Sequence, residues 1–213
     1  MDTTNSPTES ITTSPATLRV VGIAGSLRQG SYNRALLNAA QELEPDGMHI
    51  EAFDLEPIPM FNQDLEGEHL PMPVRVWRET LSAADALLIA TPEYNHGVPG
   101  VLKNALDWAS RPPHQPLDAL PVAIMGATPS MWGTARGQAQ LRQTLVYPNA
   151  RPMSQPEVLI AEAHQKFSPE GRLTDAEMRQ SLHVFLEAFL DWARLVGRVS
   201  WVAPHLETEV QKG

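Results

Sequence analysis

The sequence predicts an α/β fold, a five-stranded parallel sheet in the order 2-1-3-4-5 with helices on both faces. Strand-like apolar runs alternate with segments of helical spacing along the 213 residues. Three of these runs are apolar on both sides, which is typical of strands buried within a parallel sheet. Two others are short or alternate in polarity, as edge strands do, and the order 2-1-3-4-5 places those two at the edges.

The same patterns give approximate bounds for each element. A capping box of Thr174 and Glu177 is expected to open the last helix. The segment 55–73, with four prolines, is expected to be irregular, either a lid or oligomer contact or a plain surface excursion. The expected strands are 18–24, 48–55, 85–91, 121–126 and 157–161, and the expected helices are 31–43, 74–84, 102–109, 134–146 and 174–196.

Composition limits the classes of partner and chemistry. With 42% hydrophobic residues the chain can form one domain, expected over 18–199, between a disordered leader, 1–17, and a tail, 200–213. A net charge of −9 argues against nucleic acid and anionic membranes as partners. The absence of cysteine and the scattered histidines argue against thiol catalysis and a metal site. With no secretory signal or membrane span, a cytoplasmic protein is expected.

The segment 20–34 carries the strongest local signal, because a strand ends in a polar loop that leads into a helix. A helix N-terminus favours an anion, and Ser26, Ser31 and Asn33 offer short donors for a phosphate. Arg28 adds a charged fork for the phosphate oxygens. The alternative is an ordinary turn with Ser31 as helix cap. The motif of nucleoside-triphosphate loops and that of Rossmann dinucleotide sites are both missing.

Two further loops, 92–100 and 127–133, follow the third and fourth expected strands. In the order 2-1-3-4-5 the first and third strands are neighbours. The loops 26–33 and 92–100 are therefore expected side by side at the point where the strand order reverses, which is where this fold binds FMN.

Three motifs together resemble the NADPH-dependent FMN reductase family, which has a flavodoxin-like fold and includes chromate, quinone and azo-dye reductases. They are Gly-Ser-Leu-Arg-Gln-Gly-Ser-Tyr-Asn-Arg at 25–34, Thr-Pro-Glu-Tyr-Asn at 91–95, and Pro-Gly-Val-Leu-Lys-Asn-Ala-Leu-Asp-Trp at 99–108. The similarity extends over about 18–199. Motifs that occur together in the right order are far more specific than any one of them alone.

The resemblance implies that FMN carries the chemistry, taking hydride from NADPH or NADH and passing electrons to a small acceptor such as a quinone, chromate, an azo compound or free flavin. No protein group is expected to be catalytic. The residues implied in cofactor binding are Ser26, Arg28, Ser31 and Asn33 at the phosphate, Pro92, Glu93, Tyr94, Asn95 and Gly97 along the flavin ring, and Ser130 and Gly133 at its other edge.

The family also implies a homodimer or homotetramer. The helix face with Asn104, Asp107, Trp108 and Arg111 is the candidate contact, with Trp108 as its anchor and Asp107 and Arg111 as an i, i+4 pair. The alternative for this face is a group of ordinary surface charges. Structural alternatives exist for two charged residues: Glu93 as a helix cap, and Lys103 as the partner in a surface ion pair.

Two other functions use the same fold. A flavodoxin-type electron carrier would dock redox partners without meeting a nicotinamide, and a flavin-binding sensor would modulate a partner. The arginine in the first loop, Arg28, and the segment 92–95 favour the reductase over the carrier.

Overall fold

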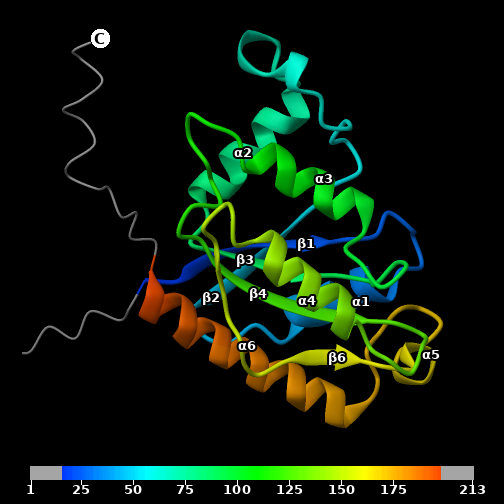
Figure 1. The fold of residues 1–213 in the computed structure, drawn as a ribbon. Coiled ribbons are helices and arrows are strands. Elements are labelled where there is room, and N and C mark those ends of the chain that lie inside the picture. The colour runs from blue at the N-terminus through cyan, green and yellow to red at the C-terminus, as the bar shows by residue number, and fades with distance from the viewer. Residues whose placement is uncertain (1–15, 198–213) are drawn as a thin grey trace, which may run out of the picture.

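The computed structural model describes residues 16–197, which form one parallel sheet with helices on both faces (Figure 1). The strands lie in the order β2-β1-β3-β4-β5, and β6 also pairs with β4, so the predicted order is confirmed. The strands are β1 Leu18–Ala24, β2 Met48–Phe53, β3 Ala86–Ala90, β4 Pro121–Ala127, β5 Arg151–Pro152 and β6 Val158–Ile160. The α-helices are α1 Tyr32–Glu42, α2 Met72–Ala83, α3 Gly100–Ala109, α4 Ala135–Thr144, α5 Ala163–Lys166 and α6 Ala176–Val196.

The sheet has six strands where five were predicted, because two short strands share its last edge. β5 pairs with the beginning of β4, through Arg151 opposite Pro121, and β6 pairs with the end of β4, through Val158 opposite Met125. β6 is the predicted fifth strand. Prolines lack the N–H that a ladder requires, and Pro156 lies in the stretch between β5 and β6 where pairing is interrupted.

Each face of the sheet carries its own hydrophobic core. On one face α1 and α6 pack against the strands, with Leu36, Phe185 and Phe189 fully buried. On the other face α2, α3 and α4 contribute a second cluster that includes Trp77 and Trp108. Burial of each such side chain contributes about 1.5–3 kcal/mol. The two layers fix the strands β1, β3 and β4, whose carboxyl ends all open on the same edge.

The first and last helices begin with side-chain caps. The Ser31 hydroxyl oxygen accepts hydrogen bonds from the backbone N–H groups of Asn33 and Arg34, at 3.2 and 3.4 Å. Ser31 is therefore a helix cap, as one of the two interpretations of the first loop predicted. The capping box predicted for α6 is wrong. Asp175, one residue later than Thr174, is the cap, and its carboxylate accepts from Met178 N at 3.0 Å. The Thr174 hydroxyl instead donates to the Lys166 carbonyl, because the preceding turn folds back on α5.

Replacing Asp175 by alanine is expected to lower the melting temperature at neutral pH by about 2–4 °C. The hydrogen bond from Lys166, followed by that from Met178 N–H, lowers the pKa of the Asp175 carboxyl. A carboxyl whose pKa falls on folding stabilises above its unfolded pKa, about 3.9, and loses that contribution as the pH drops through its folded pKa. The melting temperatures of both proteins should therefore differ most at pH 7, and the difference should shrink as the pH falls below about 3.9. A difference that is constant over this range would contradict the assignment.

The segment between β2 and α2 docks on α3. The Pro59 carbonyl accepts hydrogen bonds from the Asn104 amide at 2.9 Å and the Trp108 indole N–H at 2.8 Å. Phe61 N–H donates to the other Asn104 amide atom, Oδ1, at 2.7 Å, and the Phe61 and Trp108 rings meet edge to face. The first part of the irregular segment is therefore held by buried polar contacts, and two short 3-10 turns, Gln63–Leu65 and Gly67–His69, follow.

This docking overturns the predicted anchor for self-association. Trp108 is 0% exposed and Asn104 only 5%, since the segment covers them. The predicted pair of Asp107 and Arg111 is also absent. Arg111 pairs with Glu66 at 2.7 Å, and Asp107 pairs with Lys103 at 2.6 Å, which confirms the surface ion pair considered for Lys103.

The expected leader, 1–17, and tail, 200–213, lie almost wholly outside the described residues. None of the helices in the described part is long and apolar enough to cross a membrane. Within the same residues no group of three or more histidine, cysteine, aspartate or glutamate side chains is placed to hold a metal ion.

Candidate functional site

A cavity of about 280 Å³ opens at the carboxyl ends of the central strands, between the loops that follow β1, β3 and β4. The predicted meeting of the first two loops is therefore confirmed. Seven of the predicted site residues line the cavity: Ser26, Arg28, Ser31, Asn33, Pro92, Glu93 and Tyr94. Four residues that were not predicted complete it: Tyr32, Ala127, Thr128 and Pro129.

One end of the cavity is rich in hydrogen-bond donors. The Ser26 hydroxyl is buried and lies 3.2 Å from the Tyr94 hydroxyl, which connects the first two loops. The Ser31 hydroxyl oxygen caps α1, and its own hydrogen can still be donated to a ligand. The guanidinium of Arg28 forms no ion pair with any other described residue and lies 5.8 Å from the centre of the Tyr32 ring. Hydroxyls, an unpaired cation and a helix N-terminus together suit a phosphate monoester.

Asn33 lines the cavity, but its amide is committed to the fold. Its nitrogen donates to the Ala127 carbonyl at 2.8 Å, and its oxygen accepts from Ala127 N–H at 2.9 Å. These two buried bonds connect the first turn of α1 to the end of β4. Asn33 therefore sets the spacing between the first and third loops, a role that the sequence pattern did not indicate.

The second loop contains a tight turn at Tyr94–Gly97. Tyr94 and Gly97 exchange backbone hydrogen bonds, at 2.9 and 3.2 Å, while Asn95 and His96 both have positive φ, 51° and 61°. Two positive φ angles in the centre of a turn are those of type I′. Asn and His adopt this conformation more readily than most residues, although neither is free of strain there. The turn carries the exposed Tyr94 ring at the mouth of the cavity.

Helix α4 holds this turn from outside. Glu93 accepts a hydrogen bond from Gly137 N–H, the third residue of α4, at 2.9 Å. Gln140, one turn further on, accepts from Val98 N–H at 2.7 Å through its amide oxygen. Thr134, at the N-cap position, makes no side-chain cap bond, so Glu93 satisfies an N–H that the helix itself leaves free. The cap considered for Glu93 is confirmed.

The third loop contacts the cavity earlier in the chain than predicted. Thr128 and Pro129 line it, whereas Ser130 and Gly133 do not. Gly133 has φ +60° and is buried, and a Cβ there would lie 3.1 Å from Leu159 Cβ, which explains the glycine by packing. The Ser130 carbonyl accepts from Glu162 N–H, which fastens the loop to the residues after β6. Thr128 and Pro129 directly follow the end of the fourth strand, and that position is the feature of the sequence that could have identified them.

Replacing Gln140 by alanine is expected to loosen the turn and to weaken FMN binding about three- to tenfold. The substitution leaves Val98 N–H without its acceptor, and an unmade hydrogen bond of this kind costs about 1 kcal/mol. Titration of the apoprotein with FMN, followed by flavin fluorescence, measures the effect. The matched control is Gln143→Ala, an exposed glutamine on the same helix. Equal affinities for the two variants would show that the contact between α4 and the turn does not affect FMN binding.

Comparison with known proteins gives one family. Residues 18–165 match the sequence profile of the family described as NADPH-dependent FMN reductase. An NAD(P)H-dependent FMN reductase of Pseudomonas aeruginosa is 50% identical over 177 residues, which cover 83% of this chain and 96% of that protein. A 2-hydroxy-1,4-benzoquinone reductase of a Burkholderia species is 36% identical over 178 residues, covering 83% and 97%.

A solved structure agrees with the sequence matches. The flavoenzyme NAD(P)H:(acceptor) oxidoreductase of Paracoccus denitrificans superposes with a TM-score of 0.78 at 34% identity, covering 84% of this chain and 99% of its own. The match at 18–165 spans well over half of the sequence and includes all three loops of the cavity. The chain belongs to the NADPH-dependent FMN reductase family.

Proposed function

We propose that the protein is an FMN-dependent oxidoreductase that uses NADH or NADPH to reduce a small acceptor of the quinone class. The observation that carries this is the cavity at the N-terminus of α1, where the hydroxyls of Ser26 and Ser31 and the guanidinium of Arg28 gather next to the clamped turn Tyr94–Gly97. Relatives named as FMN and quinone reductases support the same function.

The residues at the N-terminus of α1 bind the phosphate of FMN. Ser26 and Ser31 donate hydroxyl hydrogens, and Arg28 supplies a charge-assisted pair of donors. Asn33 acts indirectly, because its bonds to Ala127 keep the first and third loops at a fixed spacing.

The second loop positions the ring of FMN. Pro92, Glu93 and Tyr94 line the cavity there, and the turn through Asn95 and Gly97 carries Tyr94. Glu93 and Gln140 hold this turn on α4. Ser130 and Gly133 shape the third loop behind Thr128 and Pro129. When bound, FMN supplies the two-electron chemistry, accepting hydride from the nicotinamide and returning electrons to the acceptor. The protein binds and orients the reactants and contributes no acid or base.

The decisive experiment is anaerobic mixing of the FMN-loaded protein with NADH or NADPH. If the protein is a reductase, NADH or NADPH bleaches the absorption band of the oxidised flavin directly, and added quinone restores the band. A flavodoxin-type carrier would be unresponsive to both nicotinamides and would be reduced only by a one-electron donor. That second result would replace the proposed function by the carrier.

We also propose that the protein forms a homodimer or homotetramer. With Trp108 buried, the support comes from large apolar side chains that remain exposed in and after the irregular segment: Met60 at 76%, Met72 at 66% and Val76 at 43%. Sedimentation of the FMN-loaded protein at micromolar concentration tests this, and a monomer would contradict it.

A further inference from the structure

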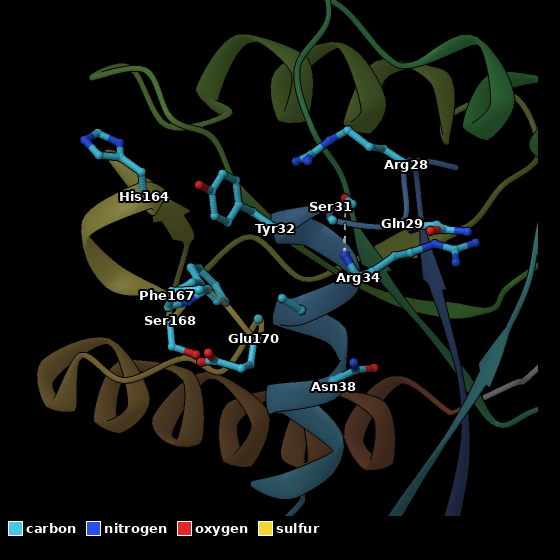
Figure 2. Close-up of a pocket in the computed structure, with 14 residues that line it drawn as sticks. Arg28, Gln29, Ser31, Tyr32, Arg34, Asn38, His164, Phe167, Ser168 and Glu170 are labelled. Atoms are coloured by element: carbon cyan, nitrogen blue, oxygen red, sulfur yellow. Dashed lines mark hydrogen bonds between the residues drawn. The ribbon is translucent and has the colours of Figure 1, made fainter.

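A second and larger cavity, of about 680 Å³, lies on the other side of the first loop (Figure 2). One wall is the start of α1, and the opposite wall is the segment 164–171. Arg28, Ser31 and Tyr32 line both this cavity and the smaller one. A ligand could therefore extend from one cavity to the other past the N-terminus of α1. Ligand pockets commonly have volumes of about 300–1,000 Å³.

The two ends of the larger cavity differ in charge. Arg28 reaches over the Tyr32 ring at the end shared with the phosphate site, and it has no carboxylate partner among the described residues. Arg34 is already occupied by Asp54, at 3.0 Å, and by the Ser26 carbonyl. On the opposite wall Glu170 is exposed, and a hydrogen bond from Ser168 lowers the pKa of its carboxyl, so it is ionised at neutral pH.

Between these ends the wall is aromatic. The rings of Tyr32 and Phe167 are 5.6 Å apart at 45°, and Phe167 is buried at 6% exposed, which gives the wall a fixed base. The segment behind it is held by its own turn, since Gly171 N–H donates to the Ser168 carbonyl at 2.9 Å. Asn38, further along α1, also lines this cavity.

We propose that this cavity binds the adenosine 5′-diphosphate half of a dinucleotide. Its phosphates meet the Arg28 guanidinium, which lines both cavities and whose five N–H donors can serve this diphosphate and the FMN phosphate together. The adenine lies against the Tyr32 ring, and the ribose hydroxyls donate to Glu170. An acidic side chain at a ribose accepts the 2′-hydroxyl and repels a 2′-phosphate. The inference rests on the proposed function, because FMN occupies the adjoining phosphate site. The dinucleotide is either the nicotinamide donor, with NADH then favoured over NADPH, or flavin adenine dinucleotide.

Calorimetric titration of the FMN-loaded protein with ADP-ribose and with 2′-phospho-ADP-ribose tests the proposal. ADP-ribose is expected to bind about tenfold more tightly. Glu170→Lys should invert this order, because the lysine ammonium attracts the 2′-phosphate that the glutamate carboxylate repels. Glu157→Lys is the matched control, an exposed glutamate outside the cavity with the same change of charge, and it should preserve the original order. Glu170→Gln, which removes the charge alone, replaces the lysine variant if that variant does not fold.

A second titration distinguishes the two sources. If the natural ligand is flavin adenine dinucleotide, the apoprotein binds it at least about tenfold more tightly than FMN, and Glu170→Lys removes the difference. If it is the nicotinamide donor, the FMN-loaded protein binds ADP-ribose. The apoprotein then binds flavin adenine dinucleotide no more tightly than FMN. The inference is overturned if ADP-ribose does not bind at roughly millimolar concentration and flavin adenine dinucleotide is no better than FMN. FMN uptake, read from the flavin absorption of the same samples, reports on the proposed function separately.

Discussion

FMN is expected to bind the Arg28→Ala variant about 10 to 150 times more weakly than the parent protein. Hydrogen bonds to charged groups are worth about 1.5–3 kcal/mol, and the Arg28 guanidinium lines the donor-rich end of the cavity without a carboxylate partner among the described residues. Because the side chain is exposed and forms no ion pair with another described residue, its removal should change the melting temperature of the apoprotein little. Fluorescence titration with FMN gives the dissociation constants.

Two further variants make this measurement specific. Arg136→Ala removes an arginine that stacks on Trp132, 4.9 Å from its ring, and does not line the cavity, so FMN affinity should be unchanged. Arg28→Lys keeps the charge but loses the planar fork, and it should fall between the parent and the alanine variant. If Arg28→Ala and Arg136→Ala bind FMN equally well, the phosphate does not lie at the N-terminus of α1.

The Trp108→Ala variant is expected to lower the free energy of unfolding by about 3–5 kcal/mol. Its indole is fully buried against the second core, packs on Phe61, and donates to the Pro59 carbonyl at 2.8 Å. The Asn104 amide still donates to the same carbonyl, so the main loss is apolar contact and the cavity left behind. Denaturant unfolding of the apoprotein measures the change.

Trp132 offers the matched control for this prediction. It is 61% exposed, so Trp132→Ala should change the stability by less than about 1 kcal/mol. Sedimentation of Trp108→Ala at several concentrations also checks the corrected role of Trp108. If the variant were as stable as the parent protein but failed to self-associate, the side chain would act at an interface after all.

The sequence by itself determined the order of the sheet and the place of the cavity. Buried strands in a parallel sheet are apolar on both faces, and this local property identified β1, β3 and β4 and hence the switch point between the first two loops. The cap at Ser31 could be predicted for the same reason, since its two partners lie two and three residues away. Four of the cavity residues, Ser26, Arg28, Ser31 and Asn33, followed from the local pattern of the first loop, and three more, Pro92, Glu93 and Tyr94, from the resemblance to the reductase family.

What only the tertiary structure decided are contacts between residues far apart in the chain. From the pattern of α3 alone Trp108 would be expected at the surface, and it is buried only because the segment 55–71 folds over it. No local rule indicates that its indole N–H will donate to the Pro59 carbonyl, 49 residues away. Asn33 has the right chemistry for a phosphate, but Ala127, 94 residues on, occupies its amide. The clamp of Gln140 on Val98 is of the same kind. A side chain's pattern specifies what it can bind, and packing between distant segments selects which of those partners it meets.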